Sequence, residues 1–135
     1  MILKSFELSK IKVNKNKFYL FYGDNEGLKE ETIKNLFEKS YSDKVHRYEE
    51  KEILDNINNF FNSILTKSFF DNEKLIIINR ATDKIRTTIE DLIEKDPEDI
   101  KIILNSKNLE KKSTLRKLFE KEKSIVCVPF YEDNN

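Results

Sequence analysis

The sequence predicts an α/β domain, a three-layer sandwich in which helices cover both faces of a five-stranded, mostly parallel sheet. Short apolar runs alternate along the chain with segments in which apolar residues recur at the spacing of an α-helix. The links between these segments are short. Alternation with short links favours parallel strands joined by right-handed crossovers.

Length and composition narrow the class of protein. The 135 residues fit one domain that buries a core without disulfides or metal. The 25 basic and 25 acidic side chains balance, so no global field attracts nucleic acid. We find no signal peptide and no apolar stretch near the roughly 20 residues that a membrane span needs. We therefore expect a cytoplasmic protein without a membrane partner, in which Cys127 is a buried, reduced thiol.

In the first half of the chain, the opening dozen residues fit either a short helix or a short strand, with Phe6, Leu8 and Ile11 as its apolar positions. Residues 17–22 are aromatic and aliphatic and form the first clear strand. A helix follows Gly27, and its apolar side is expected to hold Leu28, Ile33, Leu36 and Phe37. Residues 44–49 alternate in polarity, which favours a short edge strand.

The clearest helical period lies within residues 50–65, which are expected to form one helix against the sheet. Its apolar residues are Ile53, Ile57, Phe60, Phe61 and Ile64. Residues 75–78 follow and are apolar throughout, which is typical of a strand covered on both faces.

A second segment of the same helical spacing follows this strand, and Pro97 marks the connector after it. Its apolar residues are Ile85, Ile89, Leu92 and Ile93. Residues 100–104 form another buried strand. A last helix is expected to carry Leu109, Leu115, Leu118 and Phe119. Residues 124–128 form the fifth strand, which Pro129 closes.

Ligands of open parallel sheets usually bind beyond the carboxyl ends of the strands, so functional residues are expected at those ends. A phosphate-binding loop needs the pattern G-x-x-x-x-G-K-[ST]. After the first strand, Gly23 and Gly27 are one residue too close, and Leu28 stands where the lysine should follow. The third strand ends in Asn79-Arg80, where an ATPase keeps acidic residues. The two glycines therefore serve as turn and helix start in a degenerate loop, and no cofactor is expected.

Other chemistries fail on specific residues. Asp24 and Glu26 suit a phospho-accepting receiver domain, but Asn79 replaces its aspartate and the fifth strand supplies no lysine. His46 is expected to be a partly exposed surface side chain and Cys127 is buried, so neither suits a nucleophilic mechanism. The acidic turn at residues 96–99 is typical of solvated turns rather than calcium sites. No catalytic residue and no metal site are predicted.

The best functional candidate is the link Ser68-Phe69-Phe70, in which two large apolar rings stand in a polar connector between a helix and a strand. The rings either close the core beneath the link or bind another protein. The preceding helix already supplies Phe60 and Phe61 to the core, so we expect at least one ring of the link to project.

Several segments, taken in order and spacing, are similar to one known family. They are Phe-Tyr-Leu-Phe-Tyr-Gly at residues 18–23, Glu-Gly-Leu at 26–28, Ser-Phe-Phe at 68–70, the run 72–79 and Asn-Leu-Glu-Lys-Lys at 108–112. Over essentially its whole length the chain resembles the N-terminal domain of the delta subunit of the bacterial DNA polymerase III clamp loader. The resemblance implies a degenerate AAA+ fold, Rossmann-like and related to P-loop NTPases, without a working nucleotide site.

The resemblance also implies a function in DNA replication. In the family, a small residue followed by two hydrophobic ones, commonly Ser-Leu-Phe, occupies the peptide pocket of the sliding clamp, the beta subunit, and helps to open the ring. Ser68, Phe69 and Phe70 stand at that position here, and the helix at 50–65 is the nearest candidate for a second contact.

The family's domain organisation gives further expectations. Residues 1–135 correspond to a single N-terminal domain of a longer chain whose middle and C-terminal collar domains are absent. Other loader subunits would bind through those domains, and DNA only indirectly in the assembled loader. The domain itself would not be an enzyme, although the holoenzyme to which it contributes is a DNA-directed DNA polymerase.

Two alternatives remain. One is a nucleotide-binding α/β enzyme domain with an atypical phosphate loop at residues 23–29. The other is direct DNA binding through Lys10, Lys12, Lys15 and Lys17, although the balanced charge favours a solvated surface for that run.

Overall fold

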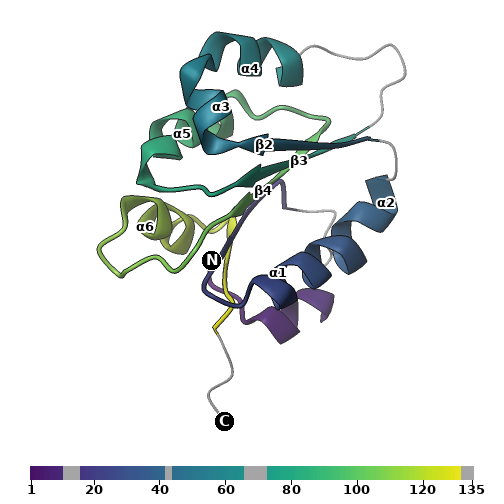
Figure 1. The fold of residues 1–135 in the computed structure, drawn as a ribbon, viewed down its shortest axis with the longest axis vertical. Coiled ribbons are helices and arrows are strands. Elements are labelled where there is room, and N and C mark those ends of the chain that lie inside the picture. Colours follow the sequence, from purple (N-terminus) through teal and green to yellow (C-terminus); the bar gives the residue numbers. More distant parts are fainter. Residues whose placement is uncertain (11–15, 42–43, 66–72, 132–135) are drawn as a thin grey trace.

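The computed structural model describes residues 1–10, 16–41, 44–65 and 73–131, and Figure 1 shows their arrangement. The elements are, in order, η1 (Ser5–Lys10), β1 (Phe18–Tyr22), α1 (Glu26–Ile33), η2 (Lys34–Glu38), α2 (Lys39–Tyr41), β2 (Val45–Glu49), α3 (Glu50–Asp55), α4 (Ile57–Leu65), β3 (Lys74–Asn79), η4 (Asp83–Ile85), α5 (Arg86–Lys95), β4 (Ile100–Asn105), α6 (Thr114–Lys121) and β5 (Val126–Pro129). No helix among these is long and apolar enough to cross a bilayer.

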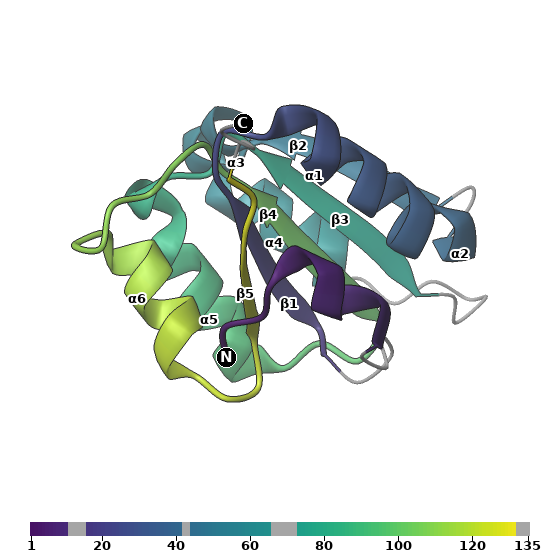
Figure 2. The same ribbon diagram turned by 90° about the horizontal axis from the view of Figure 1, so that it is seen from below.

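The five strands form one sheet in the order β2-β3-β4-β1-β5, and every neighbouring pair is parallel. The sheet is therefore wholly rather than mostly parallel. β2 lies at one edge, as its alternating polarity predicted, and exposes His46. Figure 2 views the sheet from the side of η1 and α1.

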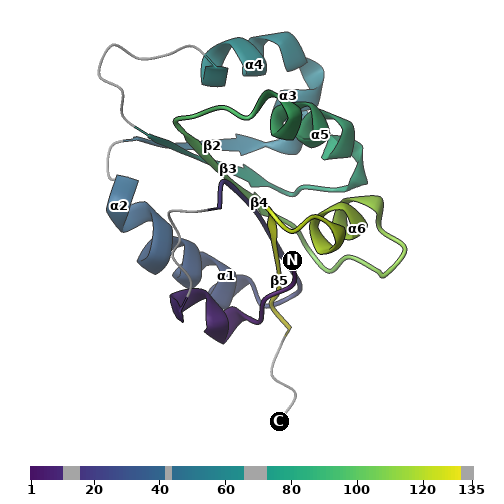
Figure 3. The same ribbon diagram turned by 180° about the vertical axis from the view of Figure 1, so that it is seen from behind.

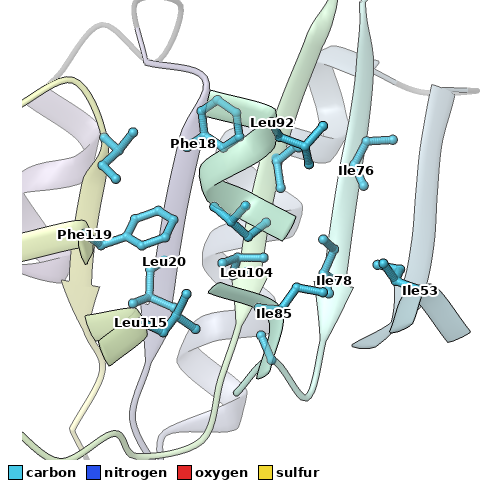
Figure 4. Close-up of a cluster of buried hydrophobic side chains, with 14 of the residues drawn as sticks. Phe18, Leu20, Ile53, Ile76, Ile78, Ile85, Leu92, Leu104, Leu115 and Phe119 are labelled. Carbon is cyan, nitrogen blue, oxygen red and sulfur yellow. The ribbon is translucent and has the colours of Figure 1, made fainter. Parts of the chain in front are cut away.

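Helices cover both faces of the sheet, which confirms the three-layer prediction. Helices α3 to α6 lie on one face, while η1, α1 and α2 lie on the other (Figures 1 and 3). Two apolar cores result, one between the sheet and each helical layer. Figure 4 shows the first core, where Leu104 of β4 lies between Leu20 of β1 and Ile78 of β3, and Leu20 lies beside Leu115 of α6. Because central parallel strands are buried on both faces, runs without polar residues signal them well.

The predicted apolar side of the helix after Gly27 is confirmed for Ile33, Leu36 and Phe37 but is wrong at its start. Leu28 is 36% exposed, whereas Lys29, Ile33 and Phe37 are completely buried. These three residues follow the spacing i, i+4, i+8, which places them on one side of the helix. The helix continues into a π-helical turn at η2 before it ends in α2.

The segment at residues 50–65 is two helices rather than the single predicted one. The helix is interrupted at Asn56, whose φ of −152° and ψ of 74° are not helical. The Asn56 side chain accepts a hydrogen bond from the Asn59 N–H at 3.1 Å, so it caps the second helix. The core side of α4 holds Phe60 and Ile64, while Ile57 is 37% exposed.

The last helix is shorter than predicted, because α6 begins after Ser113 and Leu109 lies in the preceding loop. Leu115 and Phe119 are buried as expected. At the start of the chain, Leu8 is buried on the 3₁₀ helix η1, and Ile11 lies outside the described residues.

Candidate functional site

A polar pocket of about 260 Å³ lies beyond the carboxyl ends of β1, β3 and β4, where a parallel sheet commonly binds its ligand. Its lining residues carry three carboxylates, two cations, two amides and a hydroxyl. They are Glu26, Glu30, Glu49, Asn79, Arg80, Asn105, Ser106 and Lys107. A bound phosphate would face an excess of negative charge, so the lining does not suit a nucleotide.

The loop between β1 and α1 is closed on itself. The Gly23 N–H donates to the carbonyl of Lys107 at 3.2 Å, and the Asn25 N–H donates to that of Phe130 at 3.1 Å. The Leu28 N–H donates to the Asn25 side chain at 3.1 Å, which caps α1. A phosphate loop must point such N–H groups at its ligand. Here these three have partners within the protein.

Gly23 explains why the loop can close so tightly. Its φ of 123° lies in a region that favours glycine, and a Cβ atom added there would lie 2.1 Å from the carbonyl oxygen of Phe130. The backbone after β5 therefore occupies the space beside the turn. Gly27 is different, because it lies within α1 with open surroundings and an ordinary helical backbone. The predicted roles of turn and helix start are confirmed.

Lys29 occupies the base of this loop. Its ammonium group donates to the Glu26 carboxylate at 2.7 Å and to the carbonyl of Ser106 at 2.7 Å, and the side chain is completely buried. A cation from α1 thereby satisfies a carbonyl at the end of β4. Sequence reasoning missed this residue, although the spacing from Lys29 to Ile33 and Phe37 was the signal that could have found it.

The end of β3 lacks the acidic pair of an ATPase and holds amides instead. The Asn105 side chain at the end of β4 donates to the Asn79 carboxamide oxygen at 3.2 Å and lies 3.5 Å from Glu30. Arg80 turns the chain with a φ of 55° and pairs with Glu49 at 3.7 Å. These contacts join neighbouring strand ends to one another, and none of the described residues forms a cluster that could hold a metal ion.

The predicted clamp-binding residues Ser68, Phe69 and Phe70 lie outside the described residues. The described elements on each side are α4, which ends at Leu65, and β3, which begins at Lys74. Lys74 donates to the carbonyl of Ser63 at 3.4 Å, so these two ends lie together at the amino edge of the sheet. The link is thus attached at the edge opposite the closed loop.

Beside that link, α4 and α5 form a groove with an apolar floor and a charged rim. The floor is made by Phe61 and Leu65, and the rim includes Asp91, Glu94 and Lys95. The Lys95 ammonium lies 6.0 Å from the centre of the Phe61 ring. Phe61 and Leu65 are partly buried against the core, and Ile57 is exposed on the same helix, so α4 retains a partly exposed apolar surface.

The other positions singled out in the sequence lie in different parts of the fold. His46 is exposed on β2. Cys127 is a free thiol buried in β5, and burial raises its pKa to about 12. The acidic turn begins at Asp96, which ends α5 in a left-handed conformation and pairs with Lys17 at 2.8 Å. Of the other predicted lysines, Lys12 and Lys15 lie outside the described residues.

Comparison with known proteins identifies a family and shows a similar fold among solved structures. The family described as DNA polymerase III, delta subunit, has a sequence model that matches residues 19–128. Among solved structures, the Bacillus subtilis DNA clamp loader delta protein is similar, with a TM-score of 0.69 and 17% sequence identity. The alignment covers 96% of this chain and 42% of that one, so the chain spans less than half the length of the solved protein. No curated protein sequence matches.

Proposed function

The chain belongs to the family of DNA polymerase III delta subunits, and we propose that it is the part of a clamp loader that grips the sliding clamp during DNA replication. The family match over residues 19–128 is the observation that carries this proposal. In the proposed complex, Ser68, Phe69 and Phe70 enter a pocket on the sliding clamp and help to open the ring. The role is one of binding, without catalysis by this domain.

The closed loop after β1 supports a role without nucleotide hydrolysis. The Gly23 and Asn25 N–H groups donate to backbone carbonyls within the protein. The Lys29 ammonium group donates to the Glu26 carboxylate and to the Ser106 carbonyl. The pocket beside them presents three carboxylates. A nucleotide-binding enzyme, the alternative function, would need this loop to open and its N–H groups to change partners.

We also propose that the 135 residues form one domain of a longer subunit. The alignment that covers 96% of this chain and 42% of the solved delta protein supports this organisation. Contacts with the other loader subunits would then be made by domains outside this sequence. This domain would be brought to DNA only indirectly, as part of the assembled loader.

The two phenylalanines would supply the anchor. Burying one phenylalanine side chain is worth roughly 1.5–3 kcal/mol, so the pair contributes about 3–6 kcal/mol before losses of rigid-body and side-chain freedom. An anchor of this kind binds the clamp but does not by itself open the ring. A ligand shifts an equilibrium only by its differential affinity for the two states, so ring opening requires a second contact that fits the open ring better.

Helix α4 is the proposed second contact. It adjoins the link at residues 66–72, and it carries the exposed Ile57 beside Phe61 and Leu65, which are partly buried against the core and line the groove. A partly exposed apolar helix side beside an anchor suits a helix-in-groove contact. The link would hold the ring, and α4 would press against the surface that changes when the ring opens.

The test is a titration against the sliding clamp of the same organism. The variant Phe69→Ala/Phe70→Ala should weaken binding by at least about 100-fold, since 3 kcal/mol corresponds to roughly that factor. Its thermal midpoint should match that of the wild type. The control is Tyr131→Ala, which removes a ring that is 57% exposed and follows β5, at the carboxyl ends of the strands. This variant should bind the clamp as the wild type does.

Two results would contradict the proposal. Unchanged clamp affinity in the double variant would remove the phenylalanine pair from the interface. A large fall in its thermal midpoint would instead place the two rings in the core, which is the alternative interpretation of the link.

A further inference from the structure

The sheet has one edge that carries no further strand. β2 lies at the end of the strand order β2-β3-β4-β1-β5 and pairs only with β3. At the opposite edge, the Leu3 N–H donates to the Cys127 carbonyl at 2.9 Å and Ile2 forms a bridge with Cys127, so a short segment covers β5. No described segment covers β2 in this way, and Figure 2 shows β2 beyond β3, on the side of the sheet away from β5. The β2 edge is therefore the place at which the sheet can accept another strand.

The free side of β2 presents backbone groups of Arg47. In a parallel ladder, the N–H and C=O of one residue point to the same side, and those of the next residue point to the other side. The Glu49 N–H donates to the Glu52 carboxylate at 2.9 Å, so it points away from β3. Arg47 stands two residues before Glu49, and its N–H and C=O therefore point the same way. Within the described part of the chain, neither group has a partner on that side.

The edge lacks the features that keep other edge strands unpaired. β2 pairs with β3 in continuous register, without proline, glycine or a bulge. The side chain of Arg47 is charged, but it pairs with Glu38 of η2. On the other face, Tyr48 packs on Phe60 of α4, with ring centres 5.1 Å apart. Both helical layers thus hold β2 in an extended form to which a further strand can be added.

A basic groove adjoins this edge, between β2 and the helical segment formed by η2 and α2. It has a volume of about 430 Å³ and is lined by Lys34, Glu38, Lys39, Val45 and Arg47. Because Glu38 pairs with Arg47, the exposed Lys34 and Lys39 have no acidic partner among the described residues. The whole chain has equal numbers of basic and acidic side chains, so the groove is a local excess of positive charge.

We propose that the β2 edge binds an extended acidic peptide segment of a partner protein, which adds a strand to the sheet. The backbone of this segment pairs with Arg47, and its acidic side chains reach Lys34 and Lys39 in the groove. Since alternate side chains of a strand lie on the same face, the segment is recognised by acidic residues at every second position. The contact is separate from the proposed clamp contact, which uses residues 68–70 and α4.

Two other occupants fit the edge less well. A nucleic acid backbone offers phosphate acceptors to the groove but no N–H donor to the Arg47 carbonyl. A second copy of this chain, paired antiparallel about Arg47, would place the two Arg47 side chains opposite each other and bring two basic grooves together. Like charges directly opposite each other on paired strands are destabilising. An acidic peptide matches both the backbone groups and the charge.

The test is a titration of the 135-residue chain with a fluorescent ten-residue peptide in which glutamate and valine alternate, followed by anisotropy. We expect binding that saturates below about 1 mM and slows amide exchange of Arg47 at least about tenfold. One control peptide has lysine in place of glutamate, and another is the glutamate peptide with every backbone nitrogen methylated. Each should bind at least about tenfold more weakly, because the first loses the charge match and the second loses its N–H donors.

Matched variants of the protein separate the backbone contact from the charge. Arg47→Pro removes the outward N–H, and an edge strand tolerates proline where the N–H faces solvent. Arg47→Ala loses the same charge but keeps the N–H, so the proline variant should bind at least about fivefold more weakly than the alanine variant. Lys39→Glu should also weaken binding at least about fivefold, and less at high salt. Lys51→Glu makes the same change on α3, outside the groove, and should bind as the wild type does.

Several results would overturn the proposal. The first is absence of saturable binding, and the second is equal affinity for the glutamate, lysine and methylated peptides. Tighter binding of an oligonucleotide of ten thymidines would assign the groove to nucleic acid, and a concentration-dependent dimer that Arg47→Pro abolishes would assign the edge to a second copy. If Arg47→Pro does not fold, the methylated peptide still decides whether the backbone of the ligand pairs with β2.

Discussion

Gly23 is the residue on which the closure of the β1 loop depends most directly. In Gly23→Ala, the new methyl group would meet the Phe130 carbonyl oxygen at 2.1 Å, and the backbone φ of 123° would be strained. We expect a loss of about 2–4 kcal/mol in the free energy of unfolding, measured by urea titration.

Gly27→Ala is the matched control for this substitution. An added Cβ there has its nearest atom at 3.9 Å, and alanine favours a helix by up to about 1 kcal/mol over glycine. This variant should be as stable as the wild type or slightly more stable. Similar losses in both variants would show that the β1 loop is not closed against Phe130.

Asp83 should contribute a pH-dependent part of the stability. It accepts hydrogen bonds from the Ser113 hydroxyl at 2.6 Å and from the Leu115 N–H at 3.0 Å. Burial raises the pKa of Asp83, but these bonds and those from Thr114 outweigh burial and hold the pKa below its ordinary value. A depressed carboxyl pKa stabilises the fold above the unfolded pKa of about 4, and this contribution disappears as the pH falls through the folded pKa.

Asp83→Asn is therefore expected to cost about 0.5–1 kcal/mol at about pH 7 and much less at about pH 3. Urea titrations of wild type and variant at the two pH values measure this difference. Asp91→Asn, which makes the same chemical change at an exposed position of α5, serves as control and should change the free energy of unfolding little. A pH-independent loss in the Asp83 variant would refute the role of the charge.

Single positions were predicted well where polarity and burial agree, as for Phe37 and Cys127. Lys29 and Leu28 were assigned to the wrong sides of α1, because their chemical character was given more weight than the spacing from Ile33. Burial of a lysine is tolerated only where hydrogen-bond acceptors surround its ammonium group. For Lys29, one of these acceptors is the Ser106 carbonyl, which is 77 residues distant in sequence. Local sequence contains no trace of such a partner.

Among the elements, the break between α3 and α4 offers a clear test. Asn56→Ala removes the side-chain oxygen that accepts from the Asn59 N–H, and loss of a helix cap costs about 1 kcal/mol. Thermal unfolding of the variant measures this loss. Asn59→Ala keeps the backbone donor and should be neutral or slightly stabilising, because alanine suits an exposed helical position. Equal stability of the Asn56 variant and the wild type would refute the cap.

All five strands were predicted at close to their observed positions, because four of them are short apolar runs, as buried parallel strands are, and the edge strand β2 alternates in polarity. The helices were less well defined. The apolar period of residues 50–65 continues across the break at Asn56, so periodicity alone cannot separate α3 from α4. Leu109 was assigned to the last helix but lies in the loop before it, where the Arg116 side chain donates to its carbonyl.

At the scale of the whole molecule, the two functional alternatives differ in their response to nucleotide. We expect ATP with magnesium to leave the thermal midpoint unchanged, because the N–H groups of Gly23 and Asn25 are bound to Lys107 and Phe130. Thermal shift assays over a range of nucleotide concentrations measure this. A dose-dependent rise would instead support the nucleotide-binding alternative, since a ligand that binds only the folded state stabilises it.

The sequence predicted the layered architecture of the molecule but not the strand order, because the side of the sheet to which each crossover returns depends on packing between distant helices. The same limit applies to the pocket beyond β1, β3 and β4, whose residues come from four separate segments. The assignment of Ser68, Phe69 and Phe70 to the clamp rests on sequence resemblance and stays a prediction.

The burial of Cys127 has a practical consequence for spectroscopy. It is the one cysteine of the chain, it is shielded within β5, and burial raises its pKa to about 12, so little of the reactive thiolate forms near neutral pH. A maleimide dye or spin label should therefore attach selectively to a new cysteine, such as one in Ile57→Cys, without removal of the native thiol. Distances between α4 and a labelled partner then become measurable in an otherwise natural background.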